Sequence, residues 1–239
     1  DLDKLTSGLH ENELIIIAAR PAMGKTAFAL NLAVNVASKS DKAVALFNLE
    51  MSAEQLAMRM IAAAGGIEMN KVRTGRLEHN DWKKVNEAMS ELSETNLYIE
   101  DNAGMTISEI RAKCRRLATS DKGLGLIVID YLQLISGSSK NEGNRVQEVS
   151  EISRSLKTMA MELKVPVVAL AQLSRSVELR ENKRPIMSDL RESGSIEQDA
   201  DIVMFLYRDD YYNKAAAEQT DTSITELIIG KHRNGGTGT

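Results

Sequence analysis

The stretch that decides the fold is Leu14-Ile15-Ile16-Ile17-Ala18-Ala19-Arg20-Pro21-Ala22-Met23-Gly24-Lys25-Thr26. Its aliphatic start is typical of a buried strand, and residues 27–33, which follow it, are typical of a helix. A strand, a tight loop ending in Gly-Lys-Thr and a helix together form a phosphate-binding loop. The strand–helix alternation continues along the chain without an internal repeat or linker. We therefore predict an α/β fold with a mainly parallel, twisted sheet flanked by helices.

The phosphate-binding loop itself carries the predicted nucleotide contacts. N–H groups at the start of the helix carry partial positive charge and suit phosphate oxygens. Lys25 is expected to reach the terminal phosphates and the Thr26 hydroxyl to hold Mg²⁺. The usual pattern has Gly where this chain has Ala19, so the backbone there must not need a positive φ. The alternative, a chance Gly-Lys-Thr, is disfavoured by the buried strand upstream. The predicted cofactors are ATP and Mg²⁺, and the predicted cofactor-binding residues are Ala22, Met23, Gly24, Lys25, Thr26 and Ala27.

Composition narrows the class of protein. The chain has 239 residues, enough to bury a core without disulfides or metals. Its single cysteine, Cys114, excludes an internal disulfide and suits a reducing cytoplasm, which is the predicted location. No apolar run approaches the roughly 18 residues of a membrane span, and no signal peptide is visible. The net charge of −4 excludes a globally basic nucleic-acid binder but allows a local basic strip.

Polar residues follow three of the predicted buried strands. Glu50 comes directly after residues 43–49, and Asp130 ends the aliphatic run that starts at residue 126. The carboxyl ends of parallel strands form the ligand-binding edge of an open sheet. A strand-end Asp downstream of a phosphate-binding loop is typical of the carboxylate that orders Mg²⁺, and a strand-end Glu can orient a water. Gln172 follows the predicted strand at 165–170 and reaches the same edge, where it either contacts a ligand or simply caps the strand with a polar side chain.

Other segments give weaker predictions. Residues 1–13 are expected to be a lead-in, whose leucines dock on a neighbouring surface or on their own domain, and residues 14–239 to form that domain. Residues 173–193 predict a long polar loop rich in arginine, which is usually functional or disordered. Asn234-Gly235 predicts a hairpin turn. Because its return strand is incomplete at Thr239, we expect the natural domain to continue.

Two side chains are predicted to belong to the core. Trp82 lies at helical spacing with other apolar residues over 81–92, which favours packing over stacking on a nucleotide. Cys114 lies on the apolar stripe of a helix after residue 106, which predicts a small buried hydrophobe.

Several motifs together resemble one family over the whole chain. They are Ala-Arg-Pro-Ala-Met-Gly-Lys-Thr at 19–26, Leu-Glu-Met-Ser at 49–52, Val-Ile-Asp-Tyr-Leu-Gln-Leu at 128–134, Ala-Gln-Leu-Ser-Arg at 171–175, Asp-Leu-Arg-Glu-Ser-Gly-Ser-Ile-Glu-Gln-Asp-Ala-Asp at 189–201 and Lys-His-Arg-Asn-Gly at 231–235. They are similar to the RecA-like motor domain of bacterial replicative hexameric DNA helicases of the DnaB family. Ala at position 19 is usual there. The family's amino-terminal collar domain and the end of the final hairpin are missing from this sequence.

The resemblance implies a homohexamer that binds ATP at its subunit boundaries. Lys25 and Thr26 match the family's phosphate and metal residues, and Asp130 matches its Mg²⁺-ordering carboxylate. Glu50 matches the catalytic base, and Gln172 matches the residue that senses the γ-phosphate. The implied activity is ATP hydrolysis that drives 5′-to-3′ translocation on single-stranded DNA, with primase and a helicase loader as partners and no membrane.

The resemblance also implies roles away from the phosphates. Arg233, together with Lys231, matches the finger that reaches into the neighbouring subunit's site; the alternative is a surface charge on a hairpin. Arg191, Glu192 and Gly194 match the loop that follows the DNA backbone; the alternative is a solvated loop.

Two other functions use the same core. A recombinase-like protein would form an open filament on DNA, with ATP as an assembly switch. An ATP-binding scaffold would not turn over, which the presence of Glu50 disfavours. The motifs at 189–201 and 231–235 favour the ring helicase.

Overall fold

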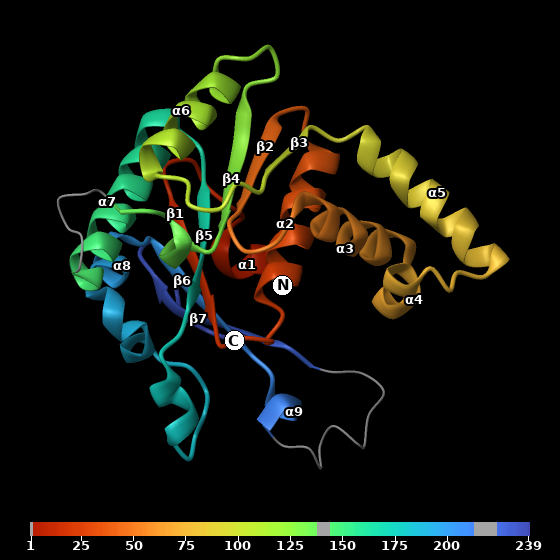
Figure 1. Cartoon of the computed structure of the whole chain (residues 1–239). Coiled ribbons are helices and arrows are strands. Elements are labelled where there is room, and N and C mark those ends of the chain that lie inside the picture. Colours follow the sequence, from red (N-terminus) through yellow and green to blue (C-terminus); the bar gives the residue numbers. More distant parts are fainter. Residues whose placement is uncertain (1, 138–143, 213–223) are drawn as a thin grey trace.

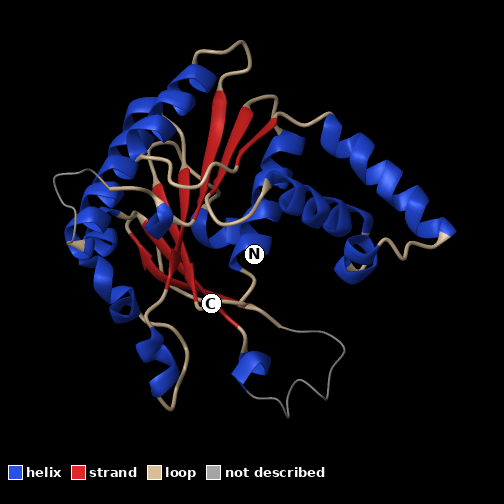
Figure 2. Ribbon diagram, in the orientation of Figure 1, coloured by secondary structure: helices blue, strands red, loops and turns tan. Residues whose placement is uncertain are grey.

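A single sheet forms the centre of the molecule. The computed structural model describes residues 2–137, 144–212 and 224–239. Within these ranges the sheet has the strand order β3-β2-β4-β5-β1-β6-β7. All neighbouring strands are parallel except β6 and β7, which are antiparallel. Helices cover both faces of this sheet (Figure 2). The predicted mainly parallel, helix-flanked sheet is confirmed.

The elements follow the predicted alternation. The strands are β1 (Leu14–Ala19), β2 (Ala43–Asn48), β3 (Leu97–Glu100), β4 (Leu124–Asp130), β5 (Val167–Gln172), β6 (Ile202–Tyr207) and β7 (Glu226–His232). The α-helices are α1 (Leu2–Thr6), α2 (Lys25–Lys39), α3 (Ala53–Gly65), α4 (Met69–Thr74), α5 (His79–Ser93), α6 (Ile107–Ala118), α7 (Arg145–Leu163), α8 (Gly194–Asp199) and α9 (Asp209–Tyr212). Short 3₁₀ helices are η1 (Leu132–Leu134), η3 (Arg175–Leu179) and η4 (Met187–Ser193). Among the described helices, none is long and apolar enough to cross a membrane.

Strand β1 is central because it contributes to both hydrophobic layers. Successive side chains of a strand point to opposite faces of the sheet. The even-numbered residues of β1 pack in the layer beneath α6 and α7, and the odd-numbered residues in the layer beneath α2 and α3 (Figure 1). All six are at most 1% exposed. Burial on both faces explains why the sequence of β1 is continuously apolar.

Capping boxes begin two of the helices, and the lone cysteine packs as the sequence predicts. Ser52 and Gln55 form a capping box at α3, and Thr106 and Glu109 form another at α6. These pairs satisfy backbone N–H groups that have no partner inside the helix. Cys114 is fully buried on α6, and burial raises the pKa of its thiol to about 12. Its expected role as a buried hydrophobe is confirmed.

Helix α5 differs from its prediction. Trp82 is 51% exposed rather than part of the core. The buried face of α5 consists of Asp81, Val85 and Ala88, so Val85 is buried as predicted while Asp81 and Ala88 replace Trp82 and Met89. The reason is local, since the Asp81 carboxylate accepts the Glu78 N–H at 3.1 Å and closes a capping box. That bond turns Asp81 inward and Trp82 outward.

Residues 173–193 do not form the structureless loop that we expected. They contain η3 and η4, which are tied together by the buried carboxylate of Asp189. Arg180 donates to both Asp189 oxygens at 2.9 and 2.8 Å, and the Ile186 N–H donates to Oδ2 at 2.8 Å. The Ser174 N–H donates to the Asp189 carbonyl at 3.1 Å. A bidentate ion pair with a buried carboxylate therefore orders a segment that looks like a loop in sequence.

The lead-in packs on its own domain. Leu2 and Leu9 contact the layer beneath α2 and α3, whereas Leu5 is 42% exposed. The Asn12 carbonyl accepts a hydrogen bond from Lys157 Nζ on α7 at 2.8 Å. Of the two docking modes left open, the structure shows the intramolecular one for Leu2 and Leu9.

Candidate nucleotide site

The phosphate-binding loop has the backbone that an anion site requires. Ala19 ends β1 without a positive φ, which meets the condition set by the sequence. Gly24 has φ 88° and caps α2 without a side-chain hydrogen bond, so side chains leave the first N–H groups of α2 available. Ala22 also has a positive φ, 65°, which costs a non-glycine residue about 1–3 kcal/mol. Nothing in the sequence indicated this strained position.

The two residues that the sequence predicts to hold Mg²⁺ are in contact. Thr26 Oγ1 donates to Asp130 Oδ2 at 2.5 Å, which joins the start of α2 to the end of β4. The other carboxylate oxygen, Asp130 Oδ1, is buried without a hydrogen-bond partner. A buried anionic oxygen without a partner is costly, and a cation ligated there would relieve the cost. The donor set therefore fits Mg²⁺.

A site with a single carboxylate is sufficient for Mg²⁺ when phosphates and waters supply the other ligands. Within the described part of the chain, no group of three or more His, Cys, Asp or Glu side chains is arranged to hold a metal. Mg²⁺ characteristically binds through one or two carboxylates together with substrate phosphates and waters. Asp130 and Thr26 would hold it in that manner.

Lys25 lies inside the site rather than in solvent. Its Nζ is 4.5 Å from the centroid of the Tyr131 ring, a cation–π contact. Burial lowers the pKa of Lys25, and the nearby carboxylates of Asp130 and Glu50 oppose that shift. The ammonium is thus partly desolvated, which strengthens its attraction for a phosphate.

Asn48 contacts the carboxylate of Asp130 and the backbone of Glu50, and we did not single it out from the sequence. Its side chain is fully buried at the end of β2. Its Oδ1 accepts the N–H groups of Glu50 at 3.0 Å and Met51 at 2.7 Å, and its Nδ2 donates to Asp130 Oδ2 at 3.3 Å. The sequence signal that could have identified Asn48 is a single amide side chain at the end of an otherwise apolar strand.

A cavity of about 260 Å³ gathers most of the predicted residues at the carboxyl ends of the strands. Glu50 and Gln172, which were predicted to reach this edge, both line the cavity. Met23 differs, since its side chain is 2% exposed and packs in the layer beneath α2. Only its backbone can therefore serve a ligand. The loop residues that line the cavity are Pro21, Ala22, Gly24, Lys25, Thr26 and Ala27.

Two arginines also line this cavity and were not predicted. Arg20 is buried; its Nε donates to Glu178 at 2.8 Å and its Nη1 to the Leu173 carbonyl at 2.8 Å. It thereby ties the phosphate-binding loop to the segment after β5. Arg59, on α3, lines the cavity and is exposed. Arg59 adds positive charge near the expected phosphates, whereas the charge of Arg20 is paired with Glu178.

Lys231 and Arg233 lie at the other edge of the sheet. His232 pairs with Ile202, at the start of β6, whereas the phosphate-binding loop follows the end of β1. With about 3.3 Å per strand residue, the two edges are roughly 20 Å apart. Arg233 therefore lies far from the phosphate-binding loop of its own chain. This distance is what we expect of a residue that reaches into the site of a neighbouring subunit.

Both side chains are held in place at that edge. Arg233 Nη1 pairs with Asp201 Oδ1 at 2.9 Å, and Nη2 donates to the Gln198 carbonyl at 3.1 Å. Lys231 Nζ donates to carbonyls at the end of α8, at 2.6 and 2.7 Å. Burial, and then the neighbouring Arg233, lower the pKa of Lys231.

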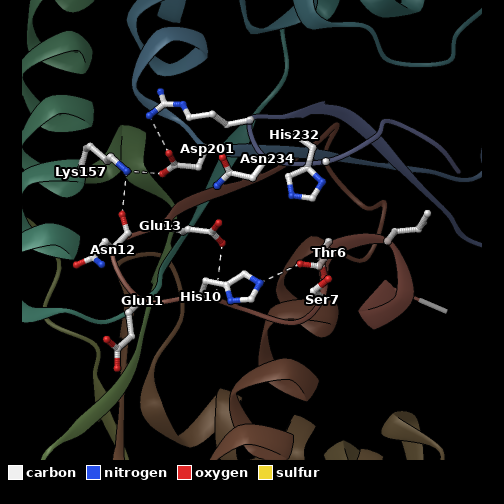
Figure 3. A pocket seen from close by; sticks show the side chains of 13 residues that line it. Thr6, Ser7, His10, Glu11, Asn12, Glu13, Lys157, Asp201, His232 and Asn234 are labelled. Atoms are coloured by element: carbon white, nitrogen blue, oxygen red, sulfur yellow. Dashed lines mark hydrogen bonds and ion pairs between the residues drawn. The ribbon is translucent and has the colours of Figure 1, made fainter.

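A cavity of about 590 Å³ adjoins this edge, between the lead-in and the end of β7 (Figure 3). Asp201 lies at its rim and shares its carboxylate between two cations, since Oδ2 pairs with Lys157 Nζ at 2.6 Å. The Leu14 N–H, at the start of β1, donates to the same oxygen at 2.8 Å. One buried carboxylate thus connects α7, β1 and Arg233.

The predicted DNA contacts lie where η4 meets α8. Arg191 and Glu192 belong to η4, and Gly194 is the first residue of α8. Their side chains lie outside the described residues. Their backbone follows Asp189, which is anchored as described above.

This fold and cavity define a RecA-like phosphate-loop nucleotide-binding domain. The family model for the DnaB-like helicase C terminal domain matches residues 1–239, and the chain belongs to that family. The resemblance drawn from the sequence is confirmed.

Relatives and solved structures agree with this assignment. The chain is 61% identical over 239 residues to the replicative DNA helicase DnaC of Bacillus subtilis (strain 168) and to the replicative DNA helicase DnaB of Geobacillus stearothermophilus. Each match covers all of this chain and 52% of the relative, so the chain spans about half their length.

Two solved structures share the fold. One, described as an ATPase domain, has a TM-score of 0.93 at 46% identity, covering 99% of this chain and 83% of that one. The other, a DnaB-like replicative helicase described with its interactions with primase, has a TM-score of 0.92 at 46% identity, covering 99% and 56%.

Paired substitutions separate binding from chemistry at this site. We expect Lys25→Ala to abolish turnover and weaken ATP binding, because the phosphates lose their ammonium. We expect Glu50→Gln to retain binding and to lose hydrolysis by a factor on the order of 10² or more, as for a lost base. Nucleotide titration and phosphate release measure the two effects, with Lys39→Ala at the far end of α2 as control. Loss of ATP binding in Glu50→Gln would assign that residue a structural role instead.

Proposed function

We propose that this chain is the motor of a replicative DNA helicase. It hydrolyses Mg-ATP at the subunit boundaries of a homohexamer, and so drives 5′-to-3′ translocation on single-stranded DNA and unwinding at the replication fork. The observation that carries the proposal is that the predicted residues lie at opposite ends of the strands. Lys25 and Glu50 line the cavity at the carboxyl ends, whereas Arg233 lies near the amino end of β1. Both 61% identical relatives are named replicative DNA helicases, which supports the same assignment here.

The residues at the phosphate edge suit phosphoryl transfer. That reaction needs charge neutralisation and an oriented water more than covalent chemistry. Lys25 neutralises the terminal phosphates, while Thr26 and Asp130 hold Mg²⁺, which supplies further positive charge. Glu50 orients the attacking water, and Gln172 contacts the γ-phosphate.

Arg233 acts on the neighbouring subunit. In its own chain it is roughly 20 Å from the phosphates, measured along β1 at the usual strand rise. A second subunit packed against this edge would receive the guanidinium, whose planar fork suits phosphate oxygens. Lys231 supports it from the same strand. Hydrolysis then depends on how two subunits fit together, which is how a ring couples chemistry to movement.

DNA is bound through its backbone. A replication motor must pass over any sequence, so contacts from Arg191, Glu192 and Gly194 follow phosphates rather than base edges. The bond from Ser174 to Asp189 supports this proposal, because it ties the exit of β5 to the segment that carries these residues. A helicase loader and primase complete the primosome in the cytoplasm; the solved relative described with primase supports the second partner.

The function is tested by ATP turnover with and without single-stranded DNA. We expect turnover by the full-length protein to rise with DNA of any base composition, and the DNA affinity to fall steeply with salt, since released counterions drive backbone binding. Particles imaged with nucleotide should be closed rings. Open filaments would favour the recombinase-like alternative, and turnover indifferent to DNA would contradict both.

Removal of the finger gives a second test. We expect Arg233→Ala to bind ATP normally through Lys25 and Thr26, yet to lose roughly 10³ or more in rate, as other phosphoryl-transfer enzymes do without their arginine. Arg111→Ala, which removes an arginine ion-paired on α6, is the control. Turnover by Arg233→Ala rings at the unmodified rate would contradict the role in trans.

A further inference from the structure

The end of β5 lacks a neighbouring strand on one side. β5 runs to Gln172, where β1 still pairs with it through Ala19. On its other side, pairing with β4 ends at Ile129 and Ala169. The last residues of β5 therefore have a strand on one flank only, at the place where Gln172 enters the nucleotide cavity.

The side chain of Gln133 occupies the open flank. Its Nε2 donates to the Gln172 carbonyl at 3.3 Å, and its Oε1 accepts the Gln172 N–H at 3.3 Å. A carboxamide carries the same donor and acceptor as a peptide group, so this reciprocal pair replaces one step of the missing ladder. The bonds go to the backbone of Gln172 and leave its side chain free for a ligand.

Gln133 is itself held in place. It lies in η1, three residues after Asp130, between Leu132 and Ile135, which are 0% and 1% exposed. Arg145, at the start of α7, donates to the Gln133 carbonyl. The turn that follows the metal-ordering strand thus supports the neighbouring strand end from a fixed position.

We propose that Gln133 is a positioning residue for γ-phosphate recognition. Its carboxamide fixes the backbone of Gln172, so that the Gln172 side chain meets the terminal phosphate at a set distance from Asp130. This inference rests on the proposed function, because it requires Gln172 to contact the γ-phosphate. Ser174 follows Gln172 by two residues, and its N–H is bonded to the Asp189 carbonyl. The position of the Gln172 backbone therefore also affects where the proposed DNA-binding segment begins.

Nucleotide discrimination tests this role directly. Gln133→Met keeps the length of the side chain and removes both hydrogen bonds, and Gln147→Met makes the same change on α7, away from the cavity. Affinities of the chain for ADP and for a non-hydrolysable ATP analogue are measured by calorimetry. We expect Gln133→Met to reduce the preference for the γ-phosphate by about five- to tenfold, the effect of one to two neutral hydrogen bonds, with ADP affinity changed less than about twofold.

A double-mutant cycle with Gln172→Ala completes the test. We expect Gln172→Ala alone to lose the same preference, and the double variant to lose no more. A Gln133→Met protein that discriminates like Gln147→Met, additive losses, or an equal loss of ADP affinity would each overturn the positioning role. If Gln172→Ala keeps the full preference, the proposed sensor itself fails and the role of Gln133 falls with it.

Discussion

The hydrogen bond from Thr26 to Asp130 is the contact on which the site depends. Thr26 lies in the first turn of α2, which follows β1, and Asp130 ends β4. Strand β5 lies between β1 and β4 in the sheet. The contact forms only because parallel strands deliver their carboxyl ends to one edge. It also leaves Asp130 Oδ1 buried without a hydrogen-bond partner, ready for a cation. Fold and chemistry are therefore linked through one pair of side chains.

Strand β1 connects the phosphate-binding loop to the region of the sheet that holds Arg233. Its carboxyl end leads into the phosphate-binding loop, and its first N–H is bonded to Asp201, which pairs with Arg233. Because β1 is fully buried between two strands, it behaves as a stiff connection. If Arg233 acts in trans as proposed, a change in the position of the phosphate-binding loop on nucleotide binding would be passed along β1 to Arg233.

Sequence patterns predicted the features that depend on local chemistry. Buried strands and the strand-end positions of Glu50 and Asp130 follow from periodicity and spacing. Arg20 and Gln133 were missed as site-shaping residues because their partners are distant in sequence. Asn48 was missed because its bond to Asp130 depends on which strand lies beside β2. Trp82 was misplaced for a local reason, since Asp81 closes a capping box with Glu78 and faces inward in place of Trp82. The order within 173–193 likewise depends on a buried ion pair that no spacing rule indicates.

The dependence of nucleotide affinity on Mg²⁺ tests the central claim most directly. The account predicts that a non-hydrolysable ATP analogue binds the unmodified chain at least about tenfold more tightly with Mg²⁺ than with a chelator, because the buried Asp130 carboxylate needs a cation beside the phosphates. Asp130→Asn should lose most of that difference, whereas Asp81→Asn, another inward-facing carboxylate, should keep it. Equal affinity with Mg²⁺ and with chelator in the unmodified chain would contradict the account.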